Sequence, residues 1–149
     1  MEILSNISLI LNPTTFGLIL GSTIVGVLIG ALPGLSSGMA IALLLPFTIY
    51  LEPSQAIAAM AALYCGGTFG GSITAILINA PGAPPAAATA FDGFPMAQKG
   101  QAGKALGMAA VSSVVGGIIS LIVLIIFAPT LARIAYKFGP PEYFALAIF

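Results

Sequence analysis

Few side chains in this sequence could carry out chemistry. The chain has no His, and Cys65 and Asp92 are its single Cys and its single Asp. This excludes a disulfide within the chain, a thiolate or imidazole zinc site and a His-based triad. Enzymatic hydrolysis needs a nucleophile with a base, or two paired acids, and the sequence supplies neither well. We therefore do not expect an enzyme. The polar side chains that remain as candidates are hydroxyls and amides that stand near Gly and Pro.

The composition indicates a membrane protein. Of the 149 residues 59% are hydrophobic and 5% are charged, whereas about a quarter of the residues in a soluble domain are charged. Most of the surface must therefore face the lipid bilayer, which favours an all-α integral membrane protein. Four Lys or Arg balance four Asp or Glu, so no basic face exists for nucleic acid.

Hydropathy and turn signals divide residues 1–149, taken as one transmembrane domain, into six helices and three signature loops. We expect about four transmembrane helices, together with a discontinuous helix or re-entrant hairpin. The predicted helices cover residues 16–32, 38–51, 54–65, 72–79, 104–128 and 130–138. The predicted loops cover residues 33–38, 66–72 and 79–100. Pro129 should end or kink the longest helix. The Lys and Arg residues before this helix are equal in number to those after it, so the positive-inside rule does not decide its orientation in the membrane.

The first loop, Pro33 to Gly38, is uncharged and places Ser36 and Ser37 before the next helix. At membrane depth its backbone amides could face an anion, provided that protein or a cavity covered them. It could equally be a tight interfacial turn in which a Ser is an ordinary N-cap. Spacing alone does not separate these two interpretations.

The second loop holds four glycines in six positions, Gly66, Gly67, Gly70 and Gly71. Two half-spans on either side of such a break are typical of transporter binding sites near the bilayer midplane. Alternatively the glycines, as two pairs four residues apart, form a face for close helix packing. Packing alone would leave the following Asn-Ala-Pro-Gly break unexplained.

The third loop contains the dipeptide Asp92-Gly93, which predicts a turn. Asp92 could orient the loop beneath a binding site or bind a cation. It could also be a turn-former whose side chain bonds local amides.

Four segments together resemble a known family in order and spacing. They are Gly30-Ala-Leu-Pro-Gly-Leu35, Tyr64-Cys-Gly-Gly-Thr-Phe-Gly-Gly-Ser72, Ile76-Leu-Ile-Asn-Ala-Pro-Gly82 and Thr89-Ala-Phe-Asp-Gly-Phe-Pro-Met-Ala-Gln-Lys-Gly100. The sequence resembles the large membrane subunit of the bacterial tripartite tricarboxylate transporters, the TctA family. Phe94, where Tyr is commoner, and Ala83-Pro84-Pro85 are mild departures from the pattern.

The resemblance implies a multi-pass protein of the bacterial inner membrane and a secondary, ion-gradient-driven transporter. Its substrates would be tricarboxylates or related organic carboxylates, with Na⁺ or H⁺ as coupling ion and no other cofactor. Its partners would be a small membrane subunit and a periplasmic solute-binding protein. Family members are longer and built from two related halves, so this chain would be the N-terminal portion of a two-repeat transporter.

With almost no cationic side chain at membrane depth, a carboxylate would have to be bound by helix N-termini and backbone amides. A coupling Na⁺ would be held by oxygen atoms, for which we expect Ser72 and Asn79. The candidate substrate- and ion-binding residues are Gly34, Ser36, Ser37, Gly67, Thr68, Gly71, Ser72, Asn79, Pro81, Gly82, Thr89 and Asp92. The alternative is a membrane scaffold or assembly subunit without a transport site, in which the glycines serve packing alone.

Overall fold

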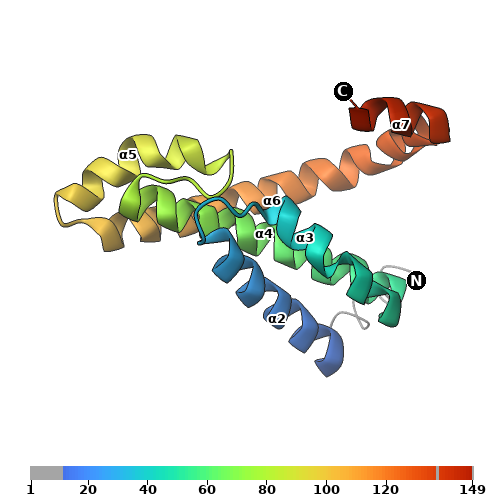
Figure 1. Ribbon diagram of the computed structural model, residues 1–149, viewed down its shortest axis with the longest axis horizontal. Coiled ribbons are helices and arrows are strands. Elements are labelled where there is room, and N and C mark those ends of the chain that lie inside the picture. The colour runs from blue at the N-terminus through green and yellow to red at the C-terminus, as the bar shows by residue number, and fades with distance from the viewer. Residues whose placement is uncertain (1–11, 137, 149) are drawn as a thin grey trace. The chain divides into compact units, whose positions relative to one another are not determined.

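A computed structural model describes residues 12–136 and 138–148, and these residues form helices joined by short loops without any β-strand (Figure 1). The helices are α2 (Pro13–Gly30), α3 (Ser37–Leu44), the 3₁₀ helix η1 (Leu45–Tyr50), α4 (Pro53–Ile78), α5 (Ala86–Gln98), α6 (Ala102–Ala135) and α7 (Pro140–Ile148). The predicted all-α class is confirmed. The chain divides into two compact units, the first ending at Ala110 and the second beginning at Val111.

Helix α2 begins three residues earlier than predicted because Asn12 caps it. The Asn12 Oδ1 atom accepts hydrogen bonds from the Thr14 backbone N–H at 3.3 Å and from the Thr14 hydroxyl at 2.8 Å. Pro13 occupies the first helical position, where its missing N–H costs nothing.

Helix α4 is continuous through the Gly-rich segment, so the break predicted at 66–72 is wrong. The discontinuous helix or re-entrant hairpin expected from the half-spans 54–65 and 72–79 is wrong with it. Each Gly lowers helix propensity by about 1 kcal/mol, but tertiary packing of a helix face commonly outweighs propensity. Gly66, Gly67 and Gly70 are buried on the face that α2 covers.

Helices α2 and α4 touch backbone to backbone at five glycines, which we call the glycine crossing: Gly26, Gly30, Gly66, Gly67 and Gly70. A methyl group on Gly66 would lie 2.5 Å from the Thr23 carbonyl oxygen. Methyl groups on Gly26 and Gly30 would overlap carbonyl oxygens of α4, and one on Gly70 would overlap a carbonyl oxygen of α2. The packing interpretation of the Gly-rich segment is therefore confirmed, as small residues let membrane helices approach closely.

The other elements of the first unit pack on α4. Helices α3, η1 and α5 all contact α4, and Leu63 and Ile76 of α4 are the largest fully buried side chains. At the start of the helix pair, the Gln55 amide Nε2 donates to the buried Thr15 hydroxyl at 3.3 Å. In Figure 1 the loop after α4 runs back alongside that helix before α5 begins.

Within the described residues three helices are long and apolar enough to cross a membrane, namely Pro13–Gly30, Pro53–Ile78 and Ala102–Arg133. The segment Ser37–Tyr50, where the sequence predicted a helix over 38–51, is a shorter apolar stretch that combines α3 with η1. The first two spans contain no charged residue, and the third has charges only near its ends, at Lys104 and Arg133.

Helix α6 passes through Pro129 and continues to Ala135, so the predicted end at residue 128 is wrong. Proline removes one backbone hydrogen bond, but an apolar helix at membrane depth gains more by keeping its remaining backbone groups bonded within the helix. The separate helix predicted at 130–138 is part of α6 up to Ala135, and its Lys137 lies outside the described residues.

The glycine crossing predicts a selective effect of substitution. Gly30→Ala should destabilise the protein by about 1–3 kcal/mol, because the added methyl group meets backbone atoms of Gly67 that cannot rotate away. Gly21→Ala on the same helix meets nothing within 4 Å and should be neutral or stabilising by up to about 1 kcal/mol. Thermal unfolding in detergent, followed by circular dichroism, measures both. A Gly30→Ala variant that melts at the same temperature as Gly21→Ala would contradict the crossing.

Candidate functional site

The loop between α2 and α3 carries the first group of predicted site residues. Gly34 is exposed and has a φ of 89°, which suits glycine. The Ser36 hydroxyl oxygen accepts a hydrogen bond from the Met39 backbone N–H at 3.2 Å. Ser36 is therefore the N-cap of α3, as one sequence interpretation held.

Four predicted site residues meet around the end of α2. A methyl group on Gly67 would lie 2.8 Å from Cβ of the buried Ser37, and a methyl group on Gly82 would overlap the Gly30 carbonyl oxygen. The Gly82 N–H donates to the Gly71 carbonyl oxygen at 3.4 Å. We call this cluster of Gly30, Ser37, Gly67, Gly71 and Gly82 the Gly30 junction. It brings together all three predicted loops.

Two threonine hydroxyls on α4 donate hydrogen bonds within the helix. The Thr68 hydroxyl donates to the Tyr64 carbonyl oxygen at 2.9 Å, and the buried Thr74 hydroxyl donates to the Gly71 carbonyl oxygen at 3.2 Å. A hydroxyl that donates in this way keeps its oxygen lone pairs available to a cation. Ser72 is half-buried on the same helix.

Asn79 ends α4 in the left-handed conformation, with a φ of 55°, and its backbone N–H donates to the Thr74 carbonyl oxygen. Asn79 and Pro81 form one side of a hollow of about 410 Å³, which we call the Asn79 hollow. Its other side comes from α5, from Ala87, Ala90, Phe91, Phe94 and Pro95. Two of the four family-like segments, those beginning at Ile76 and at Thr89, therefore meet at one hollow.

The turn predicted at Asp92-Gly93 is wrong, because both residues lie within α5. The long loop expected over 79–100 is correspondingly short and ends where α5 begins at Ala86. Asp92 is exposed on α5, and Thr89 is half-buried. Gly93 is buried against Ile76. Sequence reasoning missed this role, although the alanines that precede the dipeptide were a signal for helix over turn.

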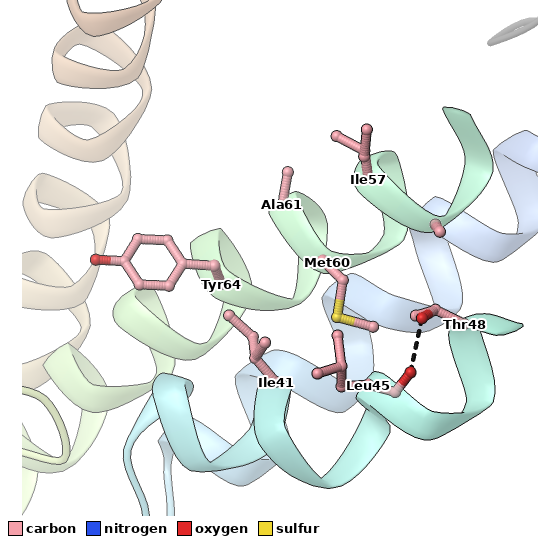
Figure 2. A pocket seen from close by; sticks show the side chains of 8 residues that line it. Ile41, Leu45, Thr48, Ile57, Met60, Ala61 and Tyr64 are labelled. Atoms are coloured by element: carbon pink, nitrogen blue, oxygen red, sulfur yellow. Dashed lines mark hydrogen bonds between the residues drawn. The ribbon is translucent and has the colours of Figure 1, made fainter. Parts of the chain in front are cut away.

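A second hollow, of about 530 Å³, lies between α3–η1 and α4 and was not predicted from the sequence. Figure 2 shows Ile41 and Leu45 on one side and Met60 on the other. The Thr48 hydroxyl beside it donates to the Leu45 carbonyl oxygen at 2.6 Å. The lining is almost wholly apolar, and Thr48 and Tyr64 are its only residues with a polar side-chain group.

The residues expected to hold Na⁺ are not brought together in this conformation. Ser72 and Asn79 are seven residues apart on α4, which corresponds to about 10 Å along a helix axis. No group of three or more His, Cys, Asp and Glu side chains is placed to hold a metal ion in the part of the chain that the structure describes.

These features define an all-α, multi-pass membrane protein. A family model described as "Tripartite tricarboxylate transporter TctA family" matches residues 16–149, and the chain belongs to this family. The description of the family names a tripartite transport system.

One curated relative is similar over almost the whole chain. It is a protein of Agrobacterium vitis described as an uncharacterized 52.8 kDa protein in the TAR-I ttuC' 3' region, and it is 43% identical over 152 residues. The match covers 99% of this chain and 30% of the relative, so the chain spans less than a third of the relative's length. No solved structure matches the chain.

Two substitutions can separate the role of the left-handed backbone of Asn79 from the role of its carboxamide. Asn79→Ala should cost about 1 kcal/mol, because an alanine is strained in the left-handed region. Asn79→Gly removes the carboxamide without that strain and should keep wild-type stability. Melting temperatures of the two variants in detergent test this expectation. Equal destabilisation of the two variants would show that the carboxamide, which both variants lack, holds the loop rather than the backbone conformation.

Proposed function

We propose that this chain is the N-terminal portion of the large membrane subunit of a secondary transporter for tricarboxylates or related organic carboxylates. Transport is driven by an ion gradient across the bacterial inner membrane and carried out with a small membrane subunit and a periplasmic solute-binding protein. The chain has no enzymatic role in this proposal. The family match over residues 16–149 is the observation that carries it.

The geometry of the first unit supports a binding role for its loops. The Gly30 junction gathers backbone from α2, α3, α4 and the loop after α4, and the Asn79 hollow lies on the same loop. Charged side chains are not among the residues that line the hollow. A carboxylate there would be held by the Asn79 carboxamide and by backbone amides, and Na⁺ by hydroxyl and carbonyl oxygens.

The glycine crossing favours the alternative, a membrane scaffold or assembly subunit, as second candidate. Packing accounts for Gly66, Gly67 and Gly70 without any ligand. Glycine packing does not explain why Asn79 and Pro81 are exposed and line a hollow. The scaffold should therefore tolerate changes at Asn79 that a transporter would not.

Uptake of labelled citrate, and of mono- and dicarboxylates, into proteoliposomes tests the proposed function. The 149-residue chain should be compared with the longer protein that contains it, with added binding protein and an inward Na⁺ or H⁺ gradient. We expect uptake by the longer protein only, because the chain spans 30% of the relative's length. If neither protein takes up a carboxylate although both are correctly inserted in the membrane, the result would favour the scaffold interpretation.

In the longer protein, Asn79→Gly should raise KM for the carboxylate or weaken the response to the coupling ion, at normal expression and melting temperature. Loss of one hydrogen bond to a charged group corresponds to about 1.5–3 kcal/mol, or about a tenfold to hundredfold change. Ala88→Gly on the exposed side of α5 is the matched control, and its KM should not change. A wild-type transport curve for Asn79→Gly would remove Asn79 from the site.

A further inference from the structure

The contact between α4 and α5 depends on a residue without a side chain. Gly93 is buried within α5, and a methyl group built on it would lie 2.6 Å from Cγ1 of Ile76, 3.5 Å from Cβ and 3.6 Å from Cδ1. Ile76 itself is completely buried in α4. Because a β-branched side chain in a helix is largely restricted to one χ1 rotamer, Cγ1 cannot easily turn away. A methyl group at position 93 would therefore move the α5 backbone.

This contact involves the same two elements as the Asn79 hollow. Ile76 precedes Asn79 by three residues, and Gly93 stands between Phe91 and Phe94, both of which line the hollow. One wall of the hollow is the C-cap of α4 with the loop that follows it, and the other is α5. The distance at which α5 rests on Ile76 thus determines how far apart the two walls are.

We propose that Gly93 and Ile76 are positioning residues that set the width of the Asn79 hollow, and that this hollow receives part of the organic carboxylate. The second half of this inference rests on the proposed function. Neither residue is among those lining the hollow, so each acts through the residues that do. A Gly in the middle of a helix costs about 1 kcal/mol relative to Ala. The close approach of α5 to Ile76, which Gly93 allows, explains why a Gly stands there.

Transport by the longer protein gives the first measurement. Gly93→Ala should raise KM for the transported carboxylate by about fivefold or more, with little change in Vmax per folded transporter. Shortening Ile76 removes the obstructing Cγ1, so the double variant Gly93→Ala/Ile76→Ala should return KM toward the wild-type value. Gly107→Ala, which meets nothing within 4 Å on α6, is the matched control and should leave KM unchanged.

If Gly93→Ala alone yields too little folded protein, Ile76→Ala is compared with the double variant. The inference requires the double variant to be closer to wild type in KM than Ile76→Ala, because the added methyl group refills the space left by the shortened side chain. A double variant worse than both single variants, or a Gly93→Ala variant that behaves like Gly107→Ala, overturns the positioning role.

Cross-linking measures the width of the Asn79 hollow and does not require a transport assay. Cys65 is exposed and is replaced by Ser, and Pro81→Cys and Ala90→Cys then place one thiol on each wall of the hollow. Gly93→Ala should shift the preferred bismaleimide to a longer spacer, and the double variant should shift it back. A shift in a protein that transports no carboxylate would refute the proposed function while upholding the spacing role. An unchanged spacer preference would refute the spacing role itself.

Discussion

The close approach of α2 to α4 is the constraint on which the first unit depends. At the glycine crossing the two backbones leave no room for a Cβ atom, and at Gly26, Gly30, Gly66 and Gly70 the obstructing atom would be a backbone carbonyl oxygen of the other helix. In a bilayer the surrounding lipid is as apolar as the side chains, so helix association relies on such van der Waals contact. Helix α4 stays continuous because this packing offsets the weak helix propensity of its glycines.

The same constraint brings the loops together. Since α2 lies directly on α4, its last residue Gly30 is close enough for Gly82, in the loop after α4, to pack on its carbonyl oxygen. Ser37 at the start of α3 packs on Gly67 in the same region. Loops that are far apart along the chain thus become neighbours without a charged side chain among the residues of the Gly30 junction.

The sequence predicted the all-α membrane class and the family, because each depends on composition or on a local pattern. It offered a Ser N-cap only as one of two interpretations of the first loop. It did not separate a break from a packing face at 66–72, because identical glycine spacing serves both, and only the partner helix decides between them. For Asp92-Gly93 it predicted a turn, because turn propensity is local, whereas the reason for Gly93 is Ile76, 17 residues earlier on another helix. The arrangement of site residues around Gly30 could not be read from the sequence, since it follows from helix contacts.

The lack of charge in the middle of the three candidate spans has an electrical consequence. A charge that moves through the whole membrane field exchanges about 2.3 kcal/mol per 100 mV with it, but Pro13–Gly30 and Pro53–Ile78 contain no charge, and α6 carries Lys104 and Arg133 only near the two ends of its span. A movement of Pro13–Gly30 or Pro53–Ile78 would therefore carry no charged side chain through the membrane field.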